Sequence, residues 1–126
     1  MVNVKAASES SVDVESAELT ERVKINAGQI IENVEIVDVH AAVSDYGPFM
    51  ALTLMDEDGE RFHIVCGESN VFGKNCIKEF ADVSDEGEYS IKEKYVGKKI
   101  WIMKDTPKQP KKGGKPYMAM KCGMMG

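Results

Sequence analysis

The sequence is poor in the residues on which several protein classes depend. Its 126 residues include three cysteines, two histidines and one tryptophan. The cysteines are too few and odd in number for a disulfide framework, so we interpret them as reduced thiols in a cytoplasm. No apolar run approaches the roughly 20 residues of a membrane helix, and the first residues hold no apolar signal core. These absences predict a cytoplasmic protein that neither spans a membrane nor is secreted.

Motifs for catalysis and for metal binding are also lacking. No G-x-x-x-x-G-K-[ST] loop and no G-x-G-x-x-G turn is present. The acidic cluster at residues 56–60 lacks the twelve-residue spacing of a calcium loop. Four zinc ligands are available in number but include no C-x-x-C pair: His40, His63, Cys66 and Cys76. We therefore expect no enzymatic activity, no metal and no cofactor.

The net charge of −5 is distributed unevenly along the chain. Residues 1–97 carry 8 Lys+Arg against 20 Asp+Glu, a net of −12, whereas residues 98–121 carry 8 lysines against Asp105 alone, a net of +7. Local potential, rather than total charge, steers an anion, so the second block predicts a polyanionic partner. The alternative is a basic hairpin that only keeps the protein in solution, but aromatic residues interleave these lysines.

Alternating β-branched residues predict an all-β chain with one short helix. Strands are expected at residues 29–40, 49–55, 61–66, 96–104 and 115–121, with a phase slip near Ile36 and Val37 that indicates a bulge. Residues 44–48 and 56–60 are predicted turns, residues 69–80 a helix capped by Ser69, and residues 81–90 and 105–114 loops. The predicted organisation is a flexible acidic N-terminal tail (1–20), a folded domain (21–122) and a frayed C-terminus (123–126).

This order of elements resembles an OB-fold: a five-stranded barrel closed through its first strand, with one short helix between strands three and four. The resemblance rests on residues 28–40, 49–66, 69–80 and 98–121. More narrowly, the chain resembles the small single-stranded-DNA-binding proteins of phages and mobile elements. Many bacterial members end in an acidic tail with an aromatic tip, whereas residues 121–126 contain no acid. Recruitment of partners through such a tip is therefore not implied.

The resemblance places the ligand across strands two and three, between the first loop and the loop that joins strands four and five. Side chains alternate across a strand, so inward Met50 and Leu52 predict outward Ala51 and Thr53. Small outward residues would let bases lie flat on the sheet. The same alternation turns Trp101 outward, although a one-residue slip would exchange the faces and bury it.

The predicted binding face combines rings for the bases with cations for the phosphates. Stacking of a base on a ring is worth about 1–3 kcal/mol and is indifferent to sequence. The face comprises Tyr46, Phe49, Arg61, His63, Lys99, Trp101 and Tyr117. A charged lip beside it comprises Lys104, Lys108, Lys111, Lys112, Lys115 and Lys121. No side chain in the stretch at residues 108–115 suits fixed base readout, so we expect little sequence preference.

The sequence thus predicts a non-enzymatic protein of phage type that coats single-stranded DNA during replication or recombination. RNA would meet the same surface and is not excluded. The alternative is an OB-like adaptor whose basic hairpin binds an acidic protein. The sequence leaves open the oligomeric state, including a homo-oligomer, and the polarity of the bound strand.

Overall fold

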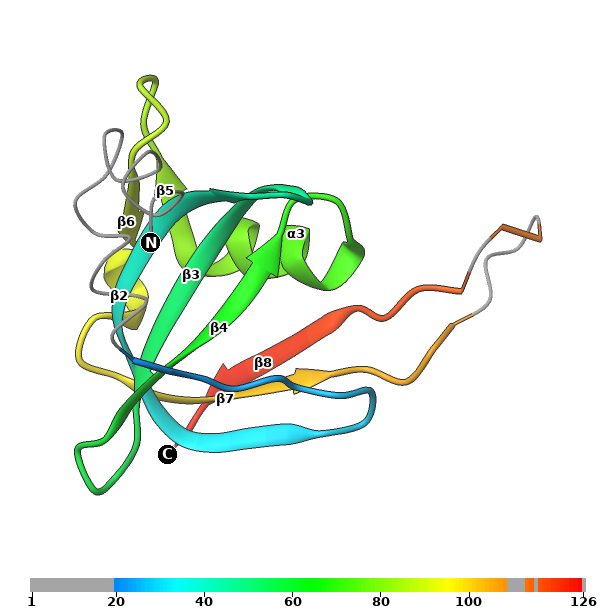
Figure 1. The fold of residues 1–126 in the computed structure, drawn as a ribbon. Coiled ribbons are helices and arrows are strands. Elements are labelled where there is room, and N and C mark those ends of the chain that lie inside the picture. The colour runs from blue at the N-terminus through cyan, green and yellow to red at the C-terminus, as the bar shows by residue number, and fades with distance from the viewer. Residues whose placement is uncertain (1–19, 109–112, 115, 126) are drawn as a thin grey trace.

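The computed structural model describes residues 20–108, 113–114 and 116–125, which form a mostly β protein (Figure 1). A six-stranded sheet has the order β1-β4-β3-β2-β7-β8, and β5 and β6 form a second, two-stranded sheet. The strands are β1 (Glu21–Arg22), β2 (Ile30–Ser44), β3 (Gly47–Met55), β4 (Arg61–Gly67), β5 (Ala81–Val83), β6 (Tyr89–Ile91), β7 (Lys99–Lys104) and β8 (Met120–Met124). Helix α3 (Val71–Phe80) follows β4, and the 3-10 helix η1 (Glu93–Tyr95) follows β6.

The long strand β2 joins the two hairpins of the larger sheet. Its first part pairs with β7 and its second part pairs with β3, both antiparallel. The register shifts between Ile36 and Asp38, which confirms the bulge predicted from the phase slip. A second shift lies between Ile31 and Val34, beside Asn33 with its φ of 57°. Bulges bend a strand, so β2 can serve both hairpins.

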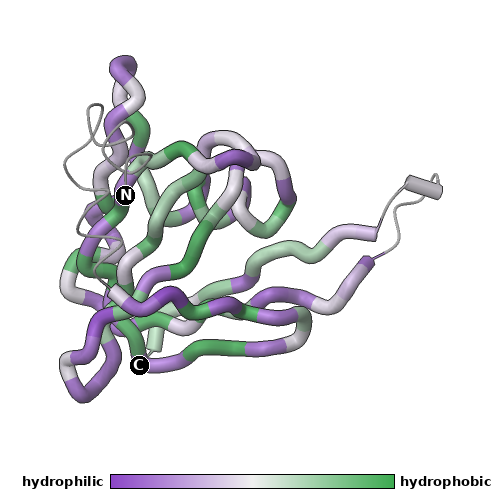
Figure 2. Tube along the Cα trace, in the orientation of Figure 1, coloured by the Kyte–Doolittle hydropathy of each residue, from purple (hydrophilic) through white to green (hydrophobic). Residues whose placement is uncertain are grey.

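The two predicted turns are present. Ser44 pairs with Gly47, so Asp45 and Tyr46 form a two-residue connection between β2 and β3, and Gly47 has a φ of 110°. In the turn between β3 and β4, an oxygen of Asp56 accepts from the backbone N–H groups of Asp58 and Glu60, each at 2.9 Å. Figure 2 shows this turn as hydrophilic, as the sequence of residues 56–60 requires.

The prediction of a closed five-stranded barrel is wrong, because the sheet has six strands and is open. The strand β1 occupies the outer edge of β4, where Glu21 pairs with Phe62 and Arg22 with His63 in parallel. Val23 continues this contact by donating its backbone N–H to the carbonyl of His63 at 2.9 Å. The outer edge of β4 offers one row of backbone N–H and C=O groups. Because β1 pairs with this row, no other strand can pair there to close the sheet into a barrel.

The acidic stretch at residues 81–90 is not only a loop, because it contains the hairpin of β5 and β6. Ser84 closes the hairpin turn: its backbone N–H donates to the carbonyl of Glu88, and its hydroxyl oxygen accepts from the N–H of Glu88 at 3.1 Å. The strand β6 packs against β2. Most side chains of residues 81–90 are exposed, as their acidic composition suggests. The strands β5 and β6 were not predicted, because each has only three residues.

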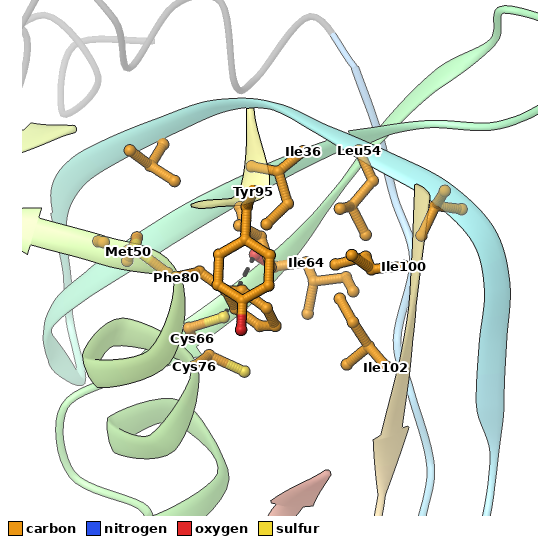
Figure 3. Packing of buried hydrophobic residues seen from close by; sticks show 14 of the residues in the cluster. Ile36, Met50, Leu54, Ile64, Cys66, Cys76, Phe80, Tyr95, Ile100 and Ile102 are labelled. Carbon is orange, nitrogen blue, oxygen red and sulfur yellow. Dashed lines mark hydrogen bonds between the residues drawn. The ribbon is translucent and has the colours of Figure 1, made fainter. Parts of the chain in front are cut away.

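The hydrophobic core lies between the larger sheet and helix α3 (Figure 3). Phe80 of the helix and Tyr95 meet edge to face, with ring centroids 5.0 Å apart. The strand orientations predicted for this face are confirmed, since six expected core side chains are buried: Met50, Leu52, Leu54, Ile64, Ile100 and Ile102.

The expectation that Ala51 and Thr53 offer an open surface for bases is wrong, since they are only 1% and 4% exposed. Ala51 lies between His40 on β2 and Val65 on β4, and Thr53 lies beside His63. Larger cross-strand neighbours on the same face can cover small side chains in a central strand.

Helix α3 begins one residue later than predicted, because Asn70 rather than Ser69 caps it. The Asn70 side chain accepts from the backbone N–H of Gly73 at 2.6 Å. Gly73 lies so close to β4 that a Cβ there would be 1.9 Å from the carbonyl oxygen of Gly67. The glycine that weakened the helical pattern in the sequence is therefore what lets the helix pack against the end of β4.

The last strand lies further along the chain than predicted. It covers Met120–Met124 rather than residues 115–121, so Gly123 and Met124 pair with Trp101 and Ile100 instead of fraying. Before it, Tyr117 and Lys108 exchange backbone hydrogen bonds of 2.8 and 3.1 Å. The described parts of the segment between β7 and β8, which we call the basic arm (105–119), extend away from the sheet (Figure 1).

Candidate nucleic-acid interface

An open groove of about 510 Å³ lies where five segments of the chain meet. These segments are the stretch after β1, the turn between β2 and β3, the end of β4, the start of helix α3 and the end of β7. We call it the basic groove, and its charged and aromatic lining residues are Arg22, Lys24, Tyr46, Phe49, Phe72 and Lys104.

Among the residues that the structure describes, all charged side chains that line the basic groove are cationic: Arg22, Lys24 and Lys104. They come from opposite ends of the chain and meet because β1 pairs with β4 while β7 pairs with β2. The start of helix α3 also lines the groove, and the positive end of the helix dipole favours negative charge there. The groove is therefore a local positive site on a chain whose net charge is negative.

Aromatic rings lie beside these cations. Tyr46, in the turn between β2 and β3, is 93% exposed, and Phe49 follows it at the start of β3. Phe72 is buried in the first turn of α3, and Lys104 Nζ lies 5.1 Å from the centre of its ring. The cation–π contact holds the Lys104 ammonium at the groove wall.

Three of the predicted binding residues thus share one groove: Tyr46, Phe49 and Lys104. Arg61 lies at the other end of β4, opposite Met55. His63 faces the segment before β1, where its Nδ1 hydrogen-bonds the Thr20 hydroxyl at 2.7 Å. The structure does not bring these two side chains to the basic groove.

Two predicted lip lysines are engaged by Asp105, whose side chain is only 8% exposed. Lys108 Nζ lies 3.0 Å and Lys121 Nζ 3.5 Å from the same oxygen of Asp105. The hydrogen bond from Lys108 lowers the pKa of the Asp105 carboxyl and raises the pKa of the Lys108 ammonium. These ion pairs fix the base of the basic arm and partly neutralise its charge.

The other predicted arm residues divide into two groups. Tyr117 is 37% exposed and lies beyond the ion pairs. Lys111, Lys112 and Lys115 lie outside the described residues.

Trp101 lies outside both the core and the basic groove. It is partly buried and lines another open groove of about 680 Å³, together with Lys121. Lys99, two residues earlier, pairs in register with Glu35 of β2. The residues of the single binding face predicted from strand alternation therefore lie partly in two separate grooves and partly outside both.

The sequence analysis missed Arg22, Lys24 and Phe72 as groove residues. Arg22 and Lys24 are the only cations between Lys5 and Arg61, and their spacing of two places them on one side of an extended segment. That spacing was a usable signal. Phe72 was assigned correctly to the helix, but its contact with Lys104 depends on tertiary packing.

Within residues 20–108, 113–114 and 116–125, no group of three His, Cys, Asp or Glu side chains could hold a metal ion. His40 Nε2 lies 2.9 Å from Asp38, and Cys66 and Cys76 are both fully buried. The hydrogen bond with Cys66, together with burial, raises the pKa of the Cys76 thiol. Both thiols therefore pack in the hydrophobic core as small apolar side chains.

No helix in the described part of the chain is long and apolar enough to cross a membrane. Comparison with known proteins found no matching family model, no matching curated protein and no matching solved structure.

Proposed function

We propose that this protein binds single-stranded DNA in the basic groove, without catalysis and with little sequence preference. The observation that carries the proposal is a groove on a chain of net charge −5 whose described lining holds three cations, no acid and an exposed tyrosine. We further propose that the fold is an open variant of the OB-fold, with β2, β3, β4, β7 and β8 as its five strands. The groove then lies between the first hairpin turn and the end of the fourth strand, where OB-folds take their ligands.

Each part of the groove has a role in this mechanism. Arg22, Lys24 and Lys104 bind phosphates, and binding releases the counterions of the polynucleotide. Tyr46 and Phe49 stack on unpaired bases, which a duplex would not expose. The side-chain oxygen of Asn70, which is the one amide side chain in the described lining of the groove, accepts a hydrogen bond from the backbone of α3. Base edges would meet few free polar groups, so sequence preference is weak.

A titration of labelled oligo-dT, followed by fluorescence anisotropy at several salt concentrations, tests the proposal. With three phosphate contacts, log K should fall against log salt with a slope of about −2. Lys24→Glu should weaken binding about tenfold or more at low salt. Lys98→Glu is the matched control, because Lys98 is exposed, lines none of the grooves described here and carries the same charge.

Three outcomes would contradict the proposal. Equal effects of the two substitutions would mean that only total charge matters. Tighter binding of oligo-U than of oligo-dT would identify an RNA-binding protein. Binding of an acidic peptide, with no binding of either oligonucleotide, would favour the adaptor alternative.

A coating function in replication or recombination is the role that this binding mode suits. Weak sequence preference and strong salt dependence are the norm for proteins that cover single strands.

A further inference from the structure

The groove that contains Trp101 repeats the chemistry of the basic groove on another part of the molecule. It lies between the second half of α3, the segment around η1 and the hairpin of β7 and β8. Its four cations are Lys78, Lys92, Lys94 and Lys121. We propose that this second groove binds the same single-stranded polynucleotide after it leaves the basic groove. This inference rests on the proposed function.

In the described lining one acid lies among these lysines, and it is already engaged, while Lys121 pairs with Asp105. Glu79 accepts a hydrogen bond from the Tyr95 hydroxyl and lies 3.1 Å from Lys94 Nζ. The hydrogen bond from Tyr95 lowers the pKa of Glu79, so this side chain is ionised and its charge is balanced by Lys94. Among the described residues, Lys78 and Lys92 make no ion pair, so their charge is available to an anion.

Trp101 supplies a ring that is held in place. It pairs across the strands with Gly123, and a Cβ at Gly123 would lie 2.6 Å from Trp101 Nε1. The glycine thus leaves room for the indole to lie close against the backbone of β8. A ring that is fixed before binding loses little conformational freedom when a base stacks on it.

Helix α3 connects the two grooves. Asn70 and Phe72 at its start line the basic groove, while Lys78 in its last turn lines the second groove. Eight residues of helix span about 12 Å, which is a short distance for a polynucleotide to bridge. Lys74 is exposed on the helix between them and offers a further phosphate contact.

The carboxylates of an acidic peptide would pair with the lysines, but they would not stack on the indole of Trp101. A polynucleotide uses both, because it carries one phosphate and one flat base per unit. The cationic groove, the fixed ring and the cationic helix between the grooves together favour one strand that contacts both sites.

Trp101 is the single tryptophan of the chain, so its fluorescence reports on the second groove alone. An oligo-dT of about 20 nucleotides should quench it, whereas one of about 4 nucleotides should bind the basic groove and leave it unchanged. Lys78→Glu with Lys92→Glu should weaken binding of the long oligonucleotide about tenfold and alter the short one little. Lys98→Glu with Arg61→Glu is the charge control, because it also changes the net charge by −4 and both side chains are exposed and line neither groove.

A second variant leaves the charge unchanged. Gly123→Ala should displace the indole and reduce quenching by the long oligonucleotide. Thermal melting monitors folding, and the lysine variants keep the test valid if Gly123→Ala destabilises the protein.

The inference is overturned if the long oligonucleotide binds without quenching Trp101 and the lysine pair has no effect, while Lys24→Glu still weakens binding. That result would leave the basic groove as the whole site. Quenching by poly-glutamate with none by the long oligonucleotide would also overturn it, because the groove would then bind protein. If no oligonucleotide of either length binds, the proposed function itself fails.

Discussion

Two grooves share Pro48 and Phe49 in their lining, and they differ in the sign of their charge. The basic groove measures about 510 Å³, and its charged lining is Arg22, Lys24 and Lys104. The neighbouring groove, which we call the acidic groove, measures about 740 Å³. Its acidic lining is Glu68, Glu86 and Glu88, and no lysine or arginine of the described part of the chain lines it.

Each groove also has a tyrosine at its rim. Tyr46 is 93% exposed in the basic groove, whereas the Tyr89 hydroxyl in the acidic groove donates to Glu68 at 3.1 Å. Burial and this hydrogen bond raise the pKa of Tyr89. Both grooves therefore contain aromatic side chains. The sign of the charged side chains distinguishes them, and only the basic groove has the positive charge that suits a polyanion.

The largest expected effect concerns the wall of the basic groove. Gly73→Ala places a Cβ 1.9 Å from the backbone oxygen of Gly67, and backbone cannot yield as a flexible side chain can. We expect a loss of about 3 kcal/mol or more in the free energy of unfolding, measured by chemical denaturation. Gly87→Ala is the control for backbone strain without a steric clash. Gly87 lines the acidic groove, has a φ of 81° and has open space around it. A Gly73→Ala protein as stable as wild type would show that α3 does not need this close approach.

The two tyrosines give a matched pair of substitutions. Tyr46→Ala should weaken oligo-dT binding by about 1–3 kcal/mol, because a stacking ring is lost. Tyr89→Ala should leave the affinity unchanged, since its groove repels phosphates. Anisotropy titrations of both variants measure the difference. Equal losses in the two variants would remove the distinction between the grooves.

Reversing charge in the acidic groove should have a smaller effect. Glu86→Lys with Glu88→Lys changes the total charge by +4 but adds no contact in the basic groove. We expect affinity for oligo-dT to rise about threefold or less, through long-range attraction that salt screens. A rise that persists at high salt would mean that the acidic groove normally excludes the strand from a second path.

The smallest effect is expected at Asp105, the one acid of the segment 98–121. Its folded pKa is lowered by Lys108, so its ion pairs stabilise the fold above the ordinary carboxyl pKa. This contribution is lost as the pH falls through the lowered pKa. Asp105→Asn should remove that part of the acid dependence of the melting temperature. It should also raise affinity slightly, because Lys108 and Lys121 are released; an unchanged acid dependence would contradict this assignment.

Local patterns predicted most of the strands because their causes are local. The alternation of Met50, Leu52 and Leu54 indicates that one face of β3 is buried. The phase slip at Val37 indicates a bulge in β2, the strand that contains it. Aspartate and glycine form the turn at residues 56–60 within five positions. The two-residue strand β1 and the three-residue strands β5 and β6 were missed, because so few residues carry no periodicity.

The candidate site was harder to predict, because distant segments build it. Tyr46 and Lys104 could be placed through the expected loops, but Arg22 reaches the groove only through the parallel pairing with His63, some 40 residues away. The position of Trp101 depends on the register with Gly123, and the sequence favoured an earlier last strand. Register depends on which partner strand is present, and a single strand does not reveal that.

The sequence by itself determined the β character, the main turns, the side of each central strand that enters the core and the concentration of lysines near the C-terminus. These follow from backbone propensity, side-chain alternation and composition, which act over a few residues. The tertiary structure decided that the sheet stays open, that cations from both ends of the chain share one groove and that the indole lies in another. Those outcomes depend on competition for strand edges and on close packing at Gly73 and Gly123, which exist only once the segments have come together.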